Sequence, residues 1–345
     1  MTIVDAHVHI GNIKENFKPI HVLAEHLNYS KFAVMSLQCK GDLLQNFACA
    51  LCKAQNPDTV FAFGGLDYIT GRDMRTQVEN LMKFGYDGVK MLEGKPTIRR
   101  MNGHALSDPI YYDFFDYMEE NSIPAVMHIA DPPEFWDEEK APPFAKEYGW
   151  LYDESDVPYS QYYKEVDKVL AKNPKLRAIF AHFYFLSDNP KAAQKFLDDH
   201  PSVFIDVTAG IEMYENFSKD PAFWREFFIK NDHRIVFGTD STDFVDRIND
   251  PDPDEKVDIG GYAAMEIEFL RSDKEIDIFG KKINGINLPE SSQKPIFSEN
   301  FYSLVGTEPK KLNITALKEE AEFIRGFLKT DEDKKTLDHI VSQLG

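Results

Sequence analysis

The most constraining feature of the chain is a regular alternation of strand-like and helix-like segments from Val4 to Thr239. Apolar runs of strand length recur along this stretch, and segments with helical spacing of apolar residues separate them. The predicted strands are Val4–Ile10, Phe32–Leu37, Thr59–Leu66, Gly88–Leu92, Pro124–Ile129, Arg177–His182, Val203–Val207 and Ile235–Thr239. Such alternation favours a parallel sheet with helical crossovers, and about eight units indicate a closed (β/α)8 barrel of the TIM type.

The length and composition of the chain fit one large α/β unit. Its 345 residues are 43% hydrophobic and 13% aromatic, which is enough to bury a large core. We expect residues 1–306 to form the barrel, with loop insertions. We expect residues 307–345 to form a C-terminal helical appendage of the same domain, because Asn313–Leu328 and Asp331–Leu344 carry apolar residues at helical spacing.

The charge of the chain limits its partners. A formal net charge of -19 argues against nucleic acid and against anionic membrane surfaces. No apolar run is long enough to span a bilayer, and no basic leader precedes the first predicted strand. We therefore expect a cytoplasmic protein with a small-molecule substrate, no nucleic acid and no membrane partner, and the question of a homo-oligomer stays open.

The cysteines predict reduced thiols. The chain has three, Cys39, Cys49 and Cys52, and an odd number without a leader fits a reducing compartment. Cys49 and Cys52 form a Cys-x-x-Cys pair, but they lie in the middle of a predicted helix, whereas a redox pair would sit at a helix N-terminus. No second pair completes a zinc site, so we interpret them as structural.

Residues of the kind that bind transition metals stand at the ends of four predicted strands. His7 and His9 form a His-x-His pair in the first strand, and strand alternation places them on one face, with Asp5 on that face too. Later strands end in His128, His182 and Asp240. Each residue alone is most simply a hydrogen-bonded structural group.

Together these residues predict one site. In a closed barrel the carboxyl ends of all strands meet at one mouth, and the first and eighth strands are neighbours. Three imidazoles and a carboxylate there suit one divalent transition metal, most simply zinc, with manganese or iron as alternatives to it. No Gly-x-Gly-x-x-Gly or Walker-type loop follows a strand, which excludes the common nucleotide-binding sites.

The same residues carry a resemblance to a known family. Asp-x-His-x-His on strand 1, His on strands 5 and 6, and Asp on strand 8 resemble the amidohydrolase superfamily. The chain is most similar to its amidohydrolase-related (amidohydrolase 2) group, which includes the aminocarboxymuconate semialdehyde decarboxylase-like enzymes. Gly88-Val89-Lys90, Gly238-Thr239-Asp240 and the helix at 296–306 match the pattern of that group as well.

The resemblance implies a role for each residue. His7, His9, His128 and Asp240 would bind the metal. Asp240 would also be catalytic, because it could take a proton from the attacking water. His182 would be a catalytic acid or base beside the metal, or a ligand of a second ion, and Asp5 would be structural support.

Two departures from the family pattern fall on loops that face the substrate. Many members carry His-x-Gly-Gly after strand 6, where this chain has His182-Phe183-Tyr184-Phe185, and many carry His-Pro after strand 4, where Met91 and Leu92 stand. No family substrate can therefore be transferred to this chain.

Lys90 has two interpretations. It is either a carbamylated bridge between two metals or a group that pairs with substrate or structure.

A long insertion predicts a cover for the site. Residues 131–159 leave the barrel directly after His128 and are rich in proline, acidic and aromatic residues, as lids often are; a surface excursion is the alternative. A second insertion at 241–261 contains the acidic run 249–255, which we interpret as a solvated loop. The predicted substrate-binding residues are Lys90, Arg99, Phe135, Trp136 and Tyr184.

The sequence predicts a metal-dependent hydrolase of a small amide, lactone or ester that uses a metal-activated water. The alternative is a metal-dependent non-oxidative decarboxylase of an aromatic or unsaturated acid, which would place a cation such as Arg99 or Arg100 against the substrate carboxylate. A barrel without catalytic activity is a third interpretation, which the intact set of predicted metal ligands disfavours.

Overall fold

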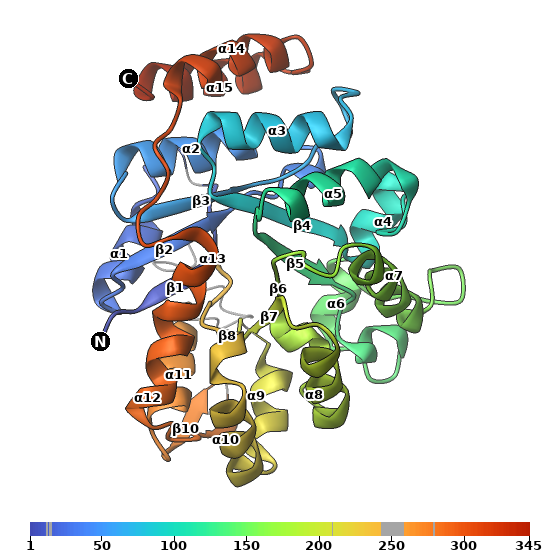
Figure 1. The fold of residues 1–345 in the computed structure, drawn as a ribbon, viewed down its shortest axis with the longest axis vertical. Helices are drawn as coiled ribbons and strands as arrows, with labels where there is room; N and C mark the ends of the chain where they lie inside the picture. Colours follow the sequence, from blue (N-terminus) through green and yellow to red (C-terminus); the bar gives the residue numbers. More distant parts are fainter. Residues whose placement is uncertain (12, 14–15, 209, 243–258, 279) are drawn as a thin grey trace.

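The computed structural model describes residues 1–11, 13, 16–208, 210–242, 259–278 and 280–345. Its centre is a curled parallel sheet with helices on its outer side (Figure 1). Nine strands follow one another in the order β8-β7-β6-β5-β4-β3-β2-β1-β9. The strands are β1 (Val4–His9), β2 (Lys31–Met35), β3 (Val60–Gly64), β4 (Gly88–Gly94), β5 (Ala125–Ile129), β6 (Ala178–Phe180), β7 (Val203–Asp206), β8 (Ile235–Val236) and β9 (Ser241–Thr242).

The two short strands β8 and β9 belong to one extended segment that closes the barrel. β8 pairs with β7, and β9 pairs with β1. Between them, Ala6 N donates to the Phe237 carbonyl oxygen at 3.0 Å and Asp240 N donates to the His7 carbonyl oxygen at 2.8 Å. The sheet is therefore continuous from β1 round to β8, and the predicted (β/α)8 barrel is confirmed.

Helices follow the barrel strands along the chain, and most of them cover the outside of the sheet. They are α1 (Lys18–His26), α2 (Gln45–Gln55), α3 (Met74–Phe84), α4 (Pro96–Asn102), α5 (Tyr112–Glu120), α6 (Pro143–Glu147), α7 (Tyr159–Lys172), α8 (Pro190–Asp199), α9 (Ile211–Ser218), α10 (Pro221–Lys230) and α11 (Ile259–Arg271). Local sequence sets their ends: in α3 the Asp73 side chain accepts from Thr76 N, and Gly85 ends the helix at φ 96°.

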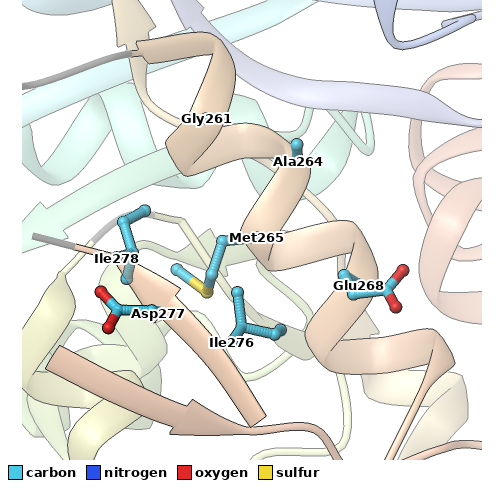
Figure 2. A pocket seen from close by; sticks show the side chains of 7 residues that line it. All are labelled: Gly261, Ala264, Met265, Glu268, Ile276, Asp277 and Ile278. Carbon is cyan, nitrogen blue, oxygen red and sulfur yellow. The ribbon is translucent and has the colours of Figure 1, made fainter. Parts of the chain in front are cut away.

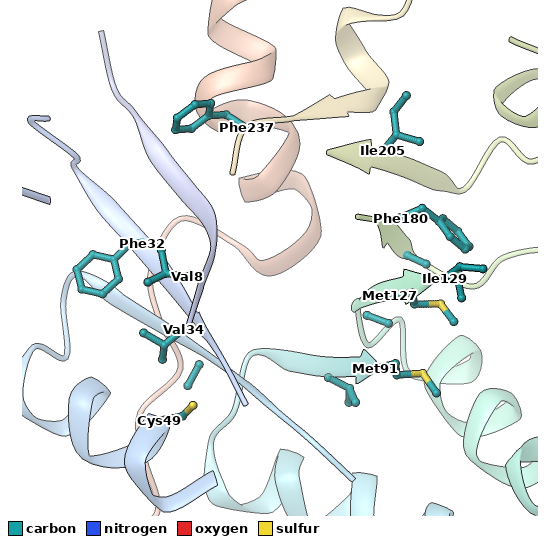
Figure 3. Close-up of a cluster of buried hydrophobic side chains, with 14 of the residues drawn as sticks. Val8, Phe32, Val34, Cys49, Met91, Met127, Ile129, Phe180, Ile205 and Phe237 are labelled. Carbon is teal, nitrogen blue, oxygen red and sulfur yellow. The ribbon is translucent and has the colours of Figure 1, made fainter. Parts of the chain in front are cut away.

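Two layers of apolar side chains surround the strands. An inner cluster fills the lower barrel with small and large residues from alternate strand positions, and Phe301 and Leu304 of α13 (Asn300–Val305) contribute to it. An outer cluster lies between sheet and helices, and Figure 3 shows part of it, with Val8, Val34 and Met91 on strands and Cys49 on α2. The inner layer leaves the upper end of the barrel, meaning the carboxyl ends of its strands, for polar side chains.

A β-bulge in β1 determines which side chains face that upper end. The pairing of β1 with β2 shifts register between Asp5 and Val8. Val4 and Ala6 belong to the inner cluster, whereas Val8 belongs to the outer one, so strand alternation is broken between them. The expectation that Asp5 shares a face with His7 and His9 is therefore wrong.

Beyond the barrel, the chain continues with a hairpin of β10 (Glu275–Ile278) and β11 (Lys281–Asn284), the short α12 (Glu290–Lys294), and two C-terminal helices. α14 (Ile314–Arg325) contacts α3, and α15 (Asp331–Gln343) contacts α2, so both lie outside the barrel wall (Figure 1). Within the described part of the chain, no helix has the length and apolar character needed to cross a membrane.

The two predicted insertions differ in how much of each the structure describes. Residues 131–159 contain a 3-10 turn at Pro133–Trp136 and helix α6. In the second insertion, residues 243–258, including the acidic run 249–255, lie outside the described residues. Cys49 and Cys52 are buried in the middle of α2, and Cys39 is buried as well.

Candidate active site

Three side chains converge at the upper end of the barrel. His9 Nε2 lies 3.0 Å and His7 Nε2 lies 3.5 Å from Asp240 Oδ1. One ligand atom from each of the three residues lies within 4.8 Å of the other two. The histidines come from the end of β1 and Asp240 comes from the segment between β8 and β9, so barrel closure brings the ends of the sheet together at this point.

Hydrogen bonds at the Nδ1 atoms of the two imidazoles turn their Nε2 atoms toward Asp240. His9 Nδ1 lies 3.1 Å from the Met35 carbonyl oxygen, which can only accept, so this nitrogen carries the proton. His7 Nδ1 lies 3.2 Å from Asp206 Oδ2. Burial is the main cause that lowers the pKa of His7 to about 4, so its ring is neutral. Two neutral Nε2 atoms and a carboxylate fit a divalent transition metal.

Asp206, at the end of β7, connects the cluster to His182. Besides His7, it accepts hydrogen bonds from His182 N at 2.7 Å and from Thr208 Oγ1 at 2.6 Å. Burial acts to raise the pKa of Asp206, but these contacts keep it below its usual value. The sequence prediction missed Asp206, although it ends an apolar strand in the same manner as His128 and Asp240.

Asp5 supports the cluster from the outer side of β1. Its carboxylate accepts from Thr239 Oγ1 at 2.6 Å, from Thr239 N and from His7 N. Gly238 lies next to this contact, and a Cβ at that position would lie 2.9 Å from His7 Cβ and 2.8 Å from Thr208 Cγ2. A side chain at 238 would therefore displace His7 or Thr208.

Lys90, on β4, is buried beside the cluster. Its Nζ lies 2.6 Å from His7 Nε2, the nitrogen that also faces Asp240. Burial is the main cause that lowers the pKa of Lys90 to about 8, and Asp240 and Asp206 oppose that shift. Lys90 thus reaches the His7 nitrogen that faces Asp240, and its predicted role as a substrate contact or a bridge stays a prediction.

His128 lies beside the three converging residues rather than among them. Its Nδ1 lies 3.0 Å from His182 Nε2, and its Nε2 lies 3.1 Å from Asp131 Oδ1. Asp131 is buried, forms an ion pair with Lys95, and accepts from Tyr152 OH at 2.6 Å. Although burial acts to raise its pKa, Lys95 and His128 hold the pKa of Asp131 well below its usual range. Asp131 and His182 thus occupy both ring nitrogens of His128.

These groups line a cavity of about 370 Å³ at the barrel mouth. Polar residues form part of its lining: His7, His9, Lys40, Lys90, Lys95, His128, Asp131, His182, Glu212 and Asp240. Aromatic side chains form another part, with Phe135, Phe144 and Trp150 from segment 131–159 and Phe185 from the turn after β6. A cavity of this size suits a small molecule.

Three of the residues predicted to bind substrate do not line this cavity. Arg99 faces Glu165, with 3.5 Å between Nη1 and Oε2. Trp136 packs against Tyr152 and Tyr159, with ring centroids 4.5 and 5.1 Å away. Tyr184 is buried against Phe196, with ring centroids 4.3 Å apart. Arg100 pairs with Asp156 instead.

A second cavity lacks such chemistry. It lies between α11 and β10, as Figure 2 shows, and measures about 500 Å³. Gly261, Ala264, Met265, Glu268, Ile276, Asp277 and Ile278 line it. Among the described residues that line it there is no histidine or cysteine, and Glu268 is paired with Lys274, so the barrel mouth is the better candidate site.

Comparison with known proteins gives a family and a fold. A family model described as amidohydrolase matches residues 28–300. No curated protein matches the chain.

Several solved structures have a similar fold. An uncharacterized TIM-barrel protein from Bordetella bronchiseptica has 12% identity and a TM-score of 0.55, over 89% of this chain and 99% of the other. The 4-oxalomesaconate hydratase from Rhodopseudomonas palustris has 13% identity and a TM-score of 0.52, over 93% and 99%. The 2,6-dihydroxybenzoate decarboxylase from Rhizobium has 15% identity and a TM-score of 0.52, over 88% and 98%. At these identities the similarity shows the fold alone.

Proposed function

The chain belongs to the amidohydrolase family, and we propose that it is a metal-dependent hydrolase of a small amide, lactone or ester. The observation that carries the proposal is the convergence of His7, His9 and Asp240 at the end of a cavity of small-molecule size. Neutral imidazole and carboxylate donors favour zinc, with manganese or iron as alternatives, over magnesium or calcium.

The bound metal would supply Lewis acidity and lower the pKa of a water molecule toward neutrality. The chain would supply the groups that receive protons. Asp240 lines the cavity beside His7 and His9 and can accept a proton there. His182 also lines the cavity, and its Nδ1 lies 3.2 Å from Thr208 Oγ1, so the ring is fixed on that side.

The cavity also has features that suit an acidic substrate. The Lys40 ammonium lines it and has no hydrogen-bond or ion-pair partner among the described residues. Burial and then repulsion from the Lys95 ammonium, which also lines the cavity, lower the pKa of Lys40. A substrate carboxylate would relieve this repulsion.

Lys40 and the aromatic lining also support a second candidate function, decarboxylation of an aromatic or unsaturated acid. Such a reaction needs a cation against the substrate carboxylate and a flat apolar surface for its ring, and the lining provides both. The two functions use the same cavity and differ in the product, because decarboxylation releases CO2 and hydrolysis releases a new acid or alcohol.

Metal analysis and a substrate screen test the proposal. The purified wild-type protein should contain close to one equivalent of zinc, manganese or iron, and His9→Ala should lose most of it. His339→Ala, a histidine substitution on the C-terminal helix α15, is the matched control and should keep the metal. A wild-type protein that binds none of these metals when they are supplied would refute the proposal.

The screen decides the reaction. We expect turnover among small lactones, amides and esters, measured as acid release. Release of CO2 from aromatic acids without hydrolysis of any ester, amide or lactone would instead establish the second candidate.

A further inference from the structure

The turn after β6 has an unusual backbone. His182, Phe183, Tyr184 and Phe185 all have positive φ angles, of 57°, 52°, 55° and 50°. Residues other than glycine disfavour this left-handed region of the backbone, and several consecutive residues seldom adopt it. Such a conformation persists only where the surrounding structure determines it, and it is common next to functional sites.

Aromatic packing on both sides stabilises the middle of the turn. The Phe183 ring stacks on Phe228 at 5.8 Å between centroids and meets Phe217 edge to face at 5.0 Å. The Tyr184 ring lies on the other side, 4.3 Å from Phe196 and 4.9 Å from Tyr163. Both rings are buried, so the turn is anchored between the α9–α10 side and the α7–α8 side of the barrel.

The anchored turn directs the next ring into the cavity. Phe185 lines the cavity and is only half-buried. Its ring stacks on His182, with centroids 5.2 Å apart and planes at 24°, and meets His128 edge to face at 5.6 Å. The strained backbone therefore has a definite result, a flat aromatic wall directly beside His182.

We propose that Phe185 is a specificity-determining residue whose ring, presented by the left-handed turn, admits a flat group beside His182 and excludes a puckered one. The inference rests on the proposed function only in that the cavity is taken as the substrate site. A flat unsaturated group can stack on the ring, whereas a saturated ring is thicker and has no π face. The other aromatic wall comes from Phe135, Phe144 and Trp150, so stacking is available along more than one side.

Two acids of equal charge and similar size test this inference without a known substrate. Benzoate is flat and cyclohexanecarboxylate is puckered, and calorimetric titration of the metal-loaded protein measures their dissociation constants. We expect wild type to bind benzoate roughly tenfold more tightly. Phe185→Gly should reduce this preference to about threefold or less, because one of the stacking walls is removed.

Matched variants separate the ring from the backbone. Tyr184→Phe removes only a buried hydroxyl outside the cavity that has no partner among the described residues, and should keep the wild-type preference. Phe185→Leu retains volume without a flat face and should lose most of the preference. Phe185→Gly should melt at a higher temperature than Phe185→Ala, because glycine adopts positive φ without strain.

The inference would be overturned if wild type bound the two acids equally or bound neither of them. It would also be overturned if Phe185→Gly kept the wild-type preference. Failure of the proposed function has a different signature, namely no turnover of lactones, amides or esters by metal-loaded protein whose binding preference is intact.

Discussion

Nε2 of His182 lies 3.0 Å from Nδ1 of His128, and this contact is the middle of a chain of polar groups between two buried carboxylates. The chain runs from Asp131 through His128 and His182 to Thr208, whose hydroxyl donates to Asp206. His182 thus lies between His128 and Thr208 and lines the cavity, in a position from which a catalytic base could act on a bound molecule.

This arrangement predicts the behaviour of His182→Asn. The variant should keep nearly normal metal content, because His182 is outside the converging set, and its turnover should fall about 10²–10⁴-fold because a proton acceptor is lost. Metal analysis and steady-state kinetics measure the two effects. His200→Asn, at the end of α8, should leave both unchanged. Loss of metal from His182→Asn would make His182 a ligand, and normal turnover would remove it from the mechanism.

Gly238→Ala should weaken metal binding although residue 238 is no ligand. A Cβ there would approach His7 Cβ to 2.9 Å, so we expect His7 to shift from its position beside Asp240. We expect at least a tenfold weaker metal affinity, in the range that displaced supporting groups usually cause. Competition with a chromogenic chelator measures it. Gly326→Ala is the control, because its added Cβ makes only an ordinary 3.6 Å contact, and equal affinities in both variants would contradict the argument.

Much of the fold could be predicted because the barrel strands are short, mostly apolar runs, and those from β5 to β8 end in or lead to a polar residue. The same rule located His128, His182 and Asp240, and it would have located Asp206 if applied to Val203–Asp206. The bulge in β1 could not be predicted, because a register shift depends on the pairing with β2 and leaves no mark in the alternation of Asp5, His7 and His9.

Contacts between distant loops explain why two other features of the site could not be predicted from the sequence. Asp131 is three residues from His128, yet nothing in the sequence shows that Lys95 and Tyr152 fix it against that ring. The left-handed turn at Phe185 was equally hidden, because its sequence contains no glycine and the conformation depends on packing of Phe183 and Tyr184. In both cases tertiary contacts override what local sequence favours.

Glu93 gives the protein a measurable pH dependence of stability. Its carboxyl is buried, accepts from Tyr68 OH at 3.1 Å, and has Oε2 without a partner among the described residues. Burial is the main cause that raises its pKa from 4.5 to about 7. Since the folded pKa is raised, the contribution of Glu93 to stability is present below about pH 4.5 and is lost as the pH rises through about 7.

Glu93→Gln should remove this dependence. The variant should match wild type near pH 5 and exceed it at pH 8.5 in free energy of unfolding, by up to roughly 3 kcal/mol. Urea unfolding at the two pH values measures the difference, and other titrating groups cancel between the variants. Glu154→Gln, at an exposed position, serves as control. A constant difference between Glu93→Gln and wild type across this range would contradict the prediction.

Replacement of the two tryptophans of segment 131–159 should affect different properties, ligand affinity for one and stability for the other. Trp150 lines the cavity, and the Lys95 ammonium lies 4.3 Å from its ring centroid. Trp150→Ala should therefore weaken ligand binding about tenfold, through lost stacking and a less fixed Lys95, with metal content unchanged. Trp136 instead packs on Tyr152 at 4.5 Å, so Trp136→Ala should lower the free energy of unfolding by about 3 kcal/mol with affinity nearly unchanged. Benzoate titration and urea unfolding of both variants make the comparison. If Trp136→Ala lost affinity while Trp150→Ala did not, segment 131–159 would have to cover the cavity in a different conformation during binding.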